Sequence, residues 1–406
     1  MPDNVKKLEG IRFVRGAGAT LFDESGNGYL DFTCSYGPIL LGHADARVNA
    51  AVAEQMARGV LFPYAPPCVD SLQEALVSFF PHADGCLFFK TGSEAVSAAI
   101  RLARAFTGRD RIVRSGFTGW HDASIAPHRK WHDHDHDVGA QPFERVPGVP
   151  AAVAQDVWPW DGCDLDALFD MARQDRRGVA AIVIDPVQLR EPLQASAMAC
   201  LQAARRLGAL LIFDETKTSL RLGLGGAQAL LGVAADLTVV GKALGNGFPL
   251  SAVLAAEPVL RHTAECRIKG TYNGEACSIA AALATLDVLR SAPDFAGRLA
   301  GLGTRMIEGF NRVAAAVGVS SAVKAVPYRW PAMPHVDFIS GDRLAAAELS
   351  RRFSHALRER RMVWLPNHMN YLSLSHTAAD VDAWLAACRD ALAAGELADA
   401  LRRVSA

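Results

Sequence analysis

A lysine and an aspartate, each at the end of a short apolar run, are the residues whose types and positions could do chemistry. Lys242 follows the run LTVVG at 237–241, and Asp214 ends the run ALLIFD at 209–214. Such runs are typical of strands buried on both faces of a parallel sheet. In these sheets ligands bind beyond the carboxyl ends of the strands, so we expect both side chains at one edge. A lysine that forms a Schiff base and a carboxylate that keeps a pyridine nitrogen protonated are what pyridoxal phosphate needs.

Further short apolar runs alternate with helical patterns along the chain. Residues 93–107 carry apolar side chains at helical spacing, with Gly108 as a stop. Strands that alternate with helices predict an α/β fold, a mainly parallel sheet covered on both faces. The apolar face of this helix comprises Val96, Ala99, Ile100, Ala103 and Phe106. The predicted strands are 86–89, 111–114, 180–185, 209–214 and 237–241, and the predicted helices are 93–107, 165–173 and 198–207.

The two ends of the chain differ from this middle part. Residues 19–33 alternate apolar and polar side chains around Ser25-Gly26-Asn27-Gly28, which predicts a hairpin. The last part is rich in alanine, arginine and leucine, and we expect helices with short strands near 336–340 and 370–375. The predicted domains are an N-terminal segment at 1–50 that packs with a small domain, a large cofactor-binding domain at 51–285, and a small α+β domain at 286–406.

The charge balance points away from polyanionic partners. The chain has 406 residues, with 42 Lys plus Arg against 43 Asp plus Glu and a net charge of −1. We therefore expect no nucleic-acid partner and no attraction to an anionic membrane. No apolar run is long enough to span a bilayer, and residues 1–10 lack the apolar core of a signal peptide. With scattered cysteines and no CxxC, these features favour a cytoplasmic protein with reduced thiols.

Weaker signals lie at other predicted strand ends. Thr91-Gly92-Ser93 precedes a helix, so it forms either an anion site at the helix N-terminus or a plain turn capped by Ser93. Phe117 could lie flat on a planar cofactor, but taken alone this position is better explained by an ordinary core aromatic. Gln188 could donate to a phenolic oxygen, although Asp185-Pro186 alone predicts a turn. Thr271 stands in a glycine-flanked loop before an alanine-rich helix.

The order and spacing of these segments carry more information than any one of them. The chain resembles the class III aminotransferases, pyridoxal-phosphate enzymes of fold type I, and within them the branch that contains glutamate-1-semialdehyde aminomutase. The resemblance covers nearly the whole chain. Its motifs include TGSEAVSAAIRLARAFTGRDRIV, GFTGWHD, IDPVQ, LLIFDETKTS, LTVVGKALGNGFPLSA, GTYNGEACS and NYLSLSHTAADVDAW.

The resemblance implies roles for matching residues. Lys242 matches the Schiff-base lysine and Asp214 the acid that faces the pyridine nitrogen, which makes the ring an electron sink. The phosphate cradle corresponds to Thr91, Gly92 and Ser93.

Further residues match the rest of the family's site. Phe117 matches the residue stacked on the ring, Gln188 one near its phenolic oxygen, and Thr216 one packed under it. Thr271 matches a phosphate contact from the neighbouring subunit, which implies a homodimer with shared sites. Tyr36 matches an aromatic residue of the substrate pocket.

Several positions depart from the family pattern. Thr118 stands where histidine is frequent, Asp185 where glutamate is usual, and Lys217 adds an amine near the site. An arginine-bearing segment found upstream in the aminomutases has no counterpart before Ile11. These departures favour an aminotransferase over glutamate-1-semialdehyde aminomutase activity.

The expected function is ping-pong transfer of an amino group between a small amine or amino acid and a carbonyl acceptor. An aminomutase or an epimerase of the same family is the first alternative. A catalytically altered pyridoxal-phosphate-binding protein is the second. The alternating histidines and aspartates at 132–137 could be read as a metal tract, but a solvated loop is favoured and no metal is expected.

Overall fold

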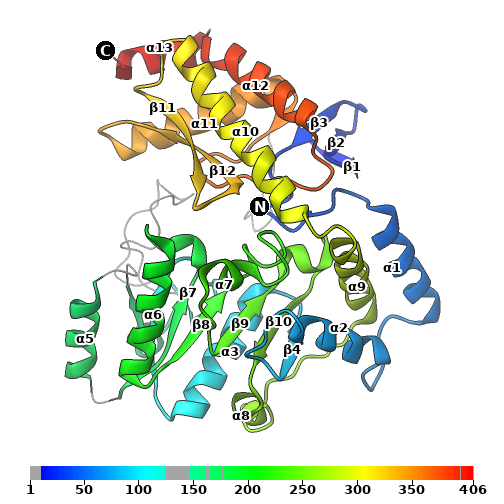
Figure 1. The fold of residues 1–406 in the computed structure, drawn as a ribbon, viewed down its shortest axis with the longest axis vertical. Helices are drawn as coiled ribbons and strands as arrows, with labels where there is room; N and C mark the ends of the chain where they lie inside the picture. The colour runs from blue at the N-terminus through cyan, green and yellow to red at the C-terminus, as the bar shows by residue number, and fades with distance from the viewer. Residues whose placement is uncertain (1–10, 125–145, 161–163, 176, 394, 406) are drawn as a thin grey trace. The chain divides into compact units, whose positions relative to one another are not determined.

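The computed structural model describes residues 11–124, 146–160, 164–175, 177–393 and 395–405, and it divides the chain into two compact units. The first, here called the sheet unit, comprises the described residues between 50 and 293. The second, here called the terminal unit, comprises residues 11–49 and those described from 294 onward. Figure 1 shows both, and each is considered by itself.

A seven-stranded sheet organises the sheet unit, in the order β4-β10-β9-β8-β7-β5-β6. The pairs from β9 to β6 are parallel, whereas β10 runs antiparallel to both β4 and β9. The strands are β4 (Gly85–Phe89), β5 (Arg111–Ser115), β6 (Val157–Pro159), β7 (Val179–Ile184), β8 (Leu210–Asp214), β9 (Leu237–Val240) and β10 (Ser251–Ala255). The predicted α/β fold with a mainly parallel sheet is confirmed.

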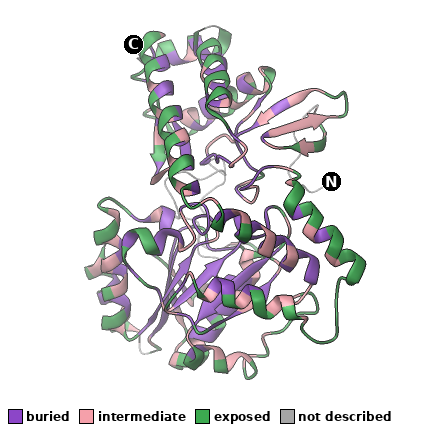
Figure 2. Ribbon diagram, turned by 45° about the vertical axis from the view of Figure 1, so that its right-hand side comes forward, coloured by how far each residue is buried: buried purple, intermediate pink, exposed green. Residues whose placement is uncertain are grey.

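Helices cover both faces of this sheet. The connection from β4 to β5 and the connection from β7 to β8 run in opposite directions along the strand order. Because such crossovers are right-handed, their helices lie on opposite faces. α3 (Gly92–Thr107) packs on one face, and α6 (Leu193–Leu207) with α5 (Leu165–Gln174) packs on the other. Figure 2 shows the strands between them as buried.

The remaining helices of the sheet unit are shorter or lie at its border. Those are α1 (Ala46–Arg58), α2 (Pro67–Val77), α4 (Ala151–Ala154), α7 (Gly226–Leu231), α8 (Glu257–Leu260), α9 (Ala276–Arg290), and the single turns η1 (Pro186–Gln188), η2 (Lys242–Gly245) and η3 (Arg261–Thr263). One core prediction was wrong. Phe106 is 43% exposed and stands edge-on to His262 with the ring centroids 6.1 Å apart, whereas the other four predicted apolar residues of α3 are buried.

The terminal unit combines a small sheet with helices. The predicted hairpin forms between β2 (Thr20–Asp23) and β3 (Gly28–Asp31), with β1 (Phe13–Ala17) and β13 (Met362–Val363) as its neighbours. A second pair, β11 (Val323–Tyr328) and β12 (Trp330–Phe338), is antiparallel. The helices are α10 (Phe295–Ala316), α11 (Arg343–Glu359), α12 (Ala378–Ala393) and α13 (Gly395–Ser405).

The strand predicted near 370–375 does not form. The backbone N–H groups of Asn370, Tyr371 and Leu374 donate instead to three separate segments, through the carbonyls of Pro334, Phe32 and Leu40. A segment whose hydrogen bonds go to different partners cannot build a ladder with one strand, which explains the failure. Among the described helices, none is long and apolar enough to cross a membrane.

Candidate active site

The carboxyl ends of the parallel strands bring the two principal side chains to one edge of the sheet. Asp214 is the last residue of β8 and pairs in register with Val239 of β9. Gly241 follows the end of β9, and Lys242 comes next, as the first residue of η2. On the other side of β8, Ile184 of β7 pairs with Phe213, so Asp185 comes next to Asp214. The predicted convergence at this edge is therefore present in the sheet register.

The amine of Lys242 lies in surroundings that disfavour its charge. The residue has a φ of 45°, in the left-handed region, which turns the chain sharply out of β9. Its side chain is half-buried. Burial first, and the charge of Lys217 second, lower the pKa of Lys242 to about 8, although Asp185 and Asp214 act in the opposite direction. About a tenth of this amine is therefore neutral at pH 7, and about half at pH 8, and the neutral form is the nucleophile.

The carboxylate of Asp214 is buried, and its immediate surroundings supply little hydrogen bonding. The backbone N–H of Thr216 donates to Asp214 Oδ1 over 3.1 Å. Burial, reinforced by the neighbouring charge of Asp185, raises the pKa of Asp214 to about 6, while Thr216 and Lys217 lower it. A buried carboxylate held in this way favours a cationic N–H partner. The protonated ring nitrogen of pyridoxal phosphate is such a partner.

A buried ion pair lies beside these two residues. The ammonium of Lys217 donates to Asp185 Oδ2, and the two side chains are 9% and 1% exposed. Lys217 Nζ also lies 5.9 Å from the ring centroid of Phe117. The sequence predicts an extra amine here but not its partner, because 32 residues separate the two.

Sequence reasoning also missed Arg114, which is buried within β5. Its Nε donates to Thr118 Oγ1 over 2.9 Å. Burial lowers the pKa of Arg114 to about 9, and the nearby Asp214 and Asp185 oppose that effect. The only signal in the sequence is an arginine inside an apolar strand, where an uncharged residue is expected.

The N-terminus of α3 forms a cradle with the segment after β8. A Cβ atom on Gly92 would lie 3.0 Å from Thr216 Cγ2, and one on Gly119 would lie 2.9 Å from Ser93 Oγ. The prediction that Ser93 caps this helix was wrong. Thr91 is the N-cap, in a capping box with Glu94, and the helix starts at Gly92. The hydroxyl of Ser93 and the first backbone N–H groups therefore lie in the first turn, where an anion is favoured.

Gly116 brings Phe117 next to Gln188. Gly116 has a φ of 88°, and a Cβ atom there would lie 2.5 Å from Gln188 Cγ and 2.8 Å from Asp185 Cβ. Such contacts require glycine at this position. The ring of Phe117 remains 37% exposed at the same edge of the sheet.

Two further predicted residues belong to other segments of the described chain. Thr271 is exposed in the segment before α9. Tyr36 belongs to the terminal unit, where its ring stands edge-on to His368 with the centroids 5.6 Å apart. The roles predicted for Thr271 and Tyr36 stay predictions. The loop at 132–137 lies outside the described residues, and within the described part of the chain no cluster of histidine, cysteine and acidic side chains could hold a metal.

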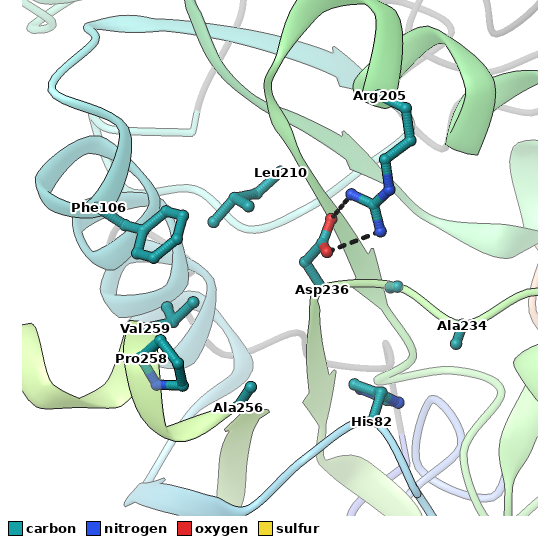
Figure 3. A pocket seen from close by; sticks show the side chains of 10 residues that line it. His82, Phe106, Arg205, Leu210, Ala234, Asp236, Ala256, Pro258 and Val259 are labelled. Atoms are coloured by element: carbon teal, nitrogen blue, oxygen red, sulfur yellow. Dashed lines mark hydrogen bonds and ion pairs between the residues drawn. The ribbon is translucent and has the colours of Figure 1, made fainter.

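A cavity of about 300 Å³ lies at the amino-terminal ends of strands β8 and β9, opposite the carboxyl ends that bear Asp214 and Lys242 (Figure 3). Leu210, the first residue of β8, and Asp236, just before β9, line it. Figure 3 shows Arg205 and Asp236 facing each other, and their two hydrogen bonds measure 2.8 and 2.9 Å. Thr238 Oγ1 lies 3.0 Å from Nε2 of His82, another lining residue. This hollow is therefore separated from Lys242 and Asp214 by the length of the strands.

The residues at the carboxyl edge fit pyridoxal phosphate. Lys242 supplies an amine with a lowered pKa, Asp214 a buried acceptor for a cationic N–H, and the start of α3 an anion cradle. Gly92 and Gly119 keep the cradle open where a side chain would fill it. These cofactor-binding groups come from separate segments of the sequence, and only the folded sheet brings them together.

Comparisons with known proteins identify the family of the chain. The family Aminotransferase class-III matches residues 1–391. A glutamate-1-semialdehyde 2,1-aminomutase from Thermus thermophilus is 34% identical, over 93% of this chain and 90% of its own length. The 2'-deamino-2'-hydroxyneamine transaminase of Streptomyces kanamyceticus is 33% identical, over 95% and 90%. The crystal structure of an omega-transaminase from Sphaerobacter thermophilus matches with a TM-score of 0.84 and 28% identity, over 97% and 94%. The chain belongs to the class III aminotransferases, pyridoxal-phosphate enzymes of fold type I.

Proposed function

We propose that this aminotransferase holds pyridoxal phosphate between Lys242 and Asp214 and uses both residues in catalysis. The observation that carries the proposal is the strand register, which sets Asp214 beside Val239 and so beside the turn that bears Lys242. Bound pyridoxal phosphate supplies an electron sink for the electrons left when a substrate carbon loses its proton. Asp214 would hold the ring nitrogen protonated, and Lys242 would carry the cofactor between turnovers.

Lys242 has a second role in this proposal. Once displaced by a substrate amine, its free amine would act as general base and acid, taking up the proton that the substrate carbon loses and returning it. A general acid and base works best when its pKa is near the working pH. The pKa of about 8 supports that role, since the amine can both accept and return a proton.

The other predicted residues position the cofactor. The first turn of α3, with Gly92 and Ser93, would hold the phosphate, and Thr91 would fix that turn through its capping box. Phe117 would stack on one face of the ring, and its partly exposed side chain supports this role. Thr216 would pack on the other face, because its Cγ2 lies against the cradle, and Gln188 would donate to the phenolic oxygen.

The reaction is ping-pong transfer of an amino group from a small amine or amino acid to a carbonyl acceptor. The relatives named as transaminases support it, and so does the 3-aminobutyryl-CoA aminotransferase of Cloacimonas acidaminovorans, at 28% identity. An aminomutase is the second candidate, favoured by the 34% identity with the Thermus enzyme. Adding one amino donor alone separates them. A transaminase accumulates keto product and pyridoxamine phosphate in equal amounts, whereas an aminomutase returns the amine to the same molecule.

A second copy of the chain would complete each site, with Thr271 reaching the partner's phosphate. Support comes from an exposed apolar segment after α1. The backbone N–H of Ala276 donates to the carbonyl of Val60 over 2.8 Å, so this segment lies beside the start of α9, close in sequence to Thr271. Its exposed apolar side chains are Val60, Leu61, Phe62 and Tyr64, and Met56 near the end of α1 is exposed as well. Exposed apolar patches of this kind mark interfaces.

We place the enzyme in the cytoplasm. Free thiols at Cys34, Cys68, Cys86, Cys200, Cys266, Cys277 and Cys388 support a reducing compartment. Fractionation of the source cells, followed by detection of the native protein, tests this assignment.

A further inference from the structure

A second lysine lies at the same edge of the sheet as Lys242. Lys217 is 9% exposed, and its ammonium is bound to Asp185, which is 1% exposed. Replacing a buried ion pair by apolar residues of similar volume is often neutral or stabilising, so such a pair is weak evidence for a structural role. Its position beside Asp214 and Lys242 suggests an electrostatic role in the site.

The groups that act on the Lys242 amine are of both signs. Asp185 and Asp214 are anionic, and they end neighbouring strands, because Ile184 and Phe213 are paired in register. Lys217 and Arg221 are cationic. Without the ammonium of Lys217, both carboxylates would attract a proton to Lys242.

We propose that Lys217 is a positioning residue that neutralises Asp185, so that Lys242 faces one uncompensated carboxylate instead of two and keeps a neutral amine for attack on a carbonyl carbon. This inference rests on the proposed role of Lys242 and concerns which neighbouring charges set the protonation of its amine. The effect of Lys217 on the pKa of Lys242 is second only to burial, and it exceeds the opposing effect of Asp185. Arg114 also faces both carboxylates, but it lies in β5 and donates to Thr118.

The test follows Lys242 itself and does not depend on turnover. Full-length protein is stripped of cofactor, and pyridoxal phosphate is added at a series of pH values. The neutral amine adds to the aldehyde carbon and one water molecule leaves, which gives a visible absorbance change. Borohydride reduction and peptide mass spectrometry then identify the modified lysine.

Lys217→Met is the informative variant, because methionine keeps much of the side-chain volume without the charge. The rate profile of adduct formation should move to higher pH. At pH 7 the rate constant should fall roughly tenfold, because a change of one in pKa alters the neutral fraction of an amine tenfold. The rates should converge at high pH, where Lys242 is neutral in both proteins.

A control removes a more exposed ion pair, at the amino-terminal ends of the strands of the same sheet. Arg205→Met breaks the bidentate pair with Asp236. It should leave the rate profile of Lys242 unchanged. A profile that moves equally in Arg205→Met would overturn the inference, because the effect would then come from general loosening of the sheet.

Two further variants keep the test decisive if Lys217→Met fails to fold. Asp185→Asn removes the carboxylate and leaves the charge of Lys217 uncompensated, so its profile should move to lower pH. Asp185→Asn with Lys217→Met removes both charges, and far-ultraviolet circular dichroism checks its fold. In the double variant Asp214 is again the one uncompensated carboxylate, so the profile should return close to that of wild type. A wild-type profile in folded Lys217→Met or Asp185→Asn would refute the inference alone. Adduct on a lysine other than Lys242 in the wild type would instead refute the proposed function.

Discussion

Gly92 and Thr216 approach each other so closely that a Cβ atom on Gly92 would lie 3.0 Å from Cγ2 of Thr216. The same methyl group would lie 3.5 Å from a Cβ atom on Gly241. Thr216 therefore lies between the start of α3 and the residue before Lys242, and its backbone N–H binds Asp214. One short segment after β8 thus connects the anion cradle, the buried acid and the reactive amine.

Gly92→Ala should narrow the anion cradle at the start of α3. The added methyl group presses on Thr216 Cγ2, so we expect pyridoxal phosphate affinity to fall by about 1–3 kcal/mol, the usual cost of overpacking. Fluorescence titration of the cofactor-free protein measures the change. Adding Thr216→Ser removes Cγ2 while keeping the hydroxyl, and should restore most of the affinity. Failure of this rescue would mean that the cradle is not limited by the Gly92–Thr216 contact.

Asp214→Asn should separate function from stability. The folded-state pKa of about 6 lies above the ordinary 3.8, so the folded protein binds this proton more tightly and loses stability as pH rises from about 4 to above 6. Asparagine does not titrate, so the variant does not lose stability in this way as the pH rises. In the cofactor-free protein it should be more stable than wild type at pH 8 by on the order of 1–3 kcal/mol, with the difference vanishing near pH 4.

Urea unfolding at both pH values measures this difference. The holoenzyme of the same variant should lose activity by several orders of magnitude, because the ring nitrogen is no longer held protonated. Near-normal turnover, or an equal stability difference at both pH values, would contradict the account of Asp214.

Glu275 should stabilise the start of α9. It accepts hydrogen bonds from the backbone N–H groups of Cys277 and Ser278, at 2.7 and 3.1 Å, and it pairs with Lys90 at 3.0 Å. Glu275→Ala should lower the free energy of unfolding by about 1–2 kcal/mol at pH 7. Glu308→Ala is the control, since its pair with Arg312 is exposed and worth less than about 0.5 kcal/mol.

The contribution of Glu275 to the free energy of unfolding should depend on pH. Although burial raises it, hydrogen bonds from Ser278 and Lys90 lower the pKa of Glu275 to about 2, below the ordinary 4.5. The charge-dependent stabilisation is therefore present above about pH 4.5 and is lost as pH falls towards 2. Comparison of wild type with Glu275→Gln by urea unfolding measures it. A difference that persists unchanged at pH 2 would show that the charge contributes nothing.

Subunit mixing tests the shared site. Lys242→Ala and Thr271→Ala should each impair the homodimer, the first abolishing turnover and the second weakening cofactor binding. In a mixed dimer one site carries both changes and the other carries neither. Activity should therefore appear on mixing and approach half of the wild-type value per mixed dimer. No recovery, with exchange verified by mass spectrometry, would place Thr271 in its own subunit's site or outside the site.

The sequence predicts the carboxyl edge of the sheet well, because parallel strands impose it. Once the apolar runs ending at Asp214 and before Lys242 are read as parallel strands, the two residues must lie at one edge. The antiparallel β10 and the pair formed by Lys217 and Asp185 could not be predicted this way. They depend on contacts between distant segments, which no local periodicity encodes.

Smaller errors have local causes. Thr91 and Ser93 are both good helix caps, and the reciprocal bonds with Glu94 decide in favour of Thr91. Phe106 has the spacing of a core residue, but it lies near the end of α3, where the side chain lines the cavity in Figure 3. The division predicted at 50/51 and 285/286 stays a prediction.

The central claim is that Lys242 carries the cofactor, and one measurement tests it most directly. The purified protein, loaded with pyridoxal phosphate, is reduced with borohydride, digested and mapped by mass spectrometry. The account predicts the reduced adduct on Lys242 alone, with Lys217 unmodified because its side-chain nitrogen is bound to Asp185. It also predicts that Lys242→Ala binds pyridoxal phosphate without a covalent link and shows no turnover. An adduct on Lys217 or any other lysine, or multiple turnovers by Lys242→Ala, would contradict the account.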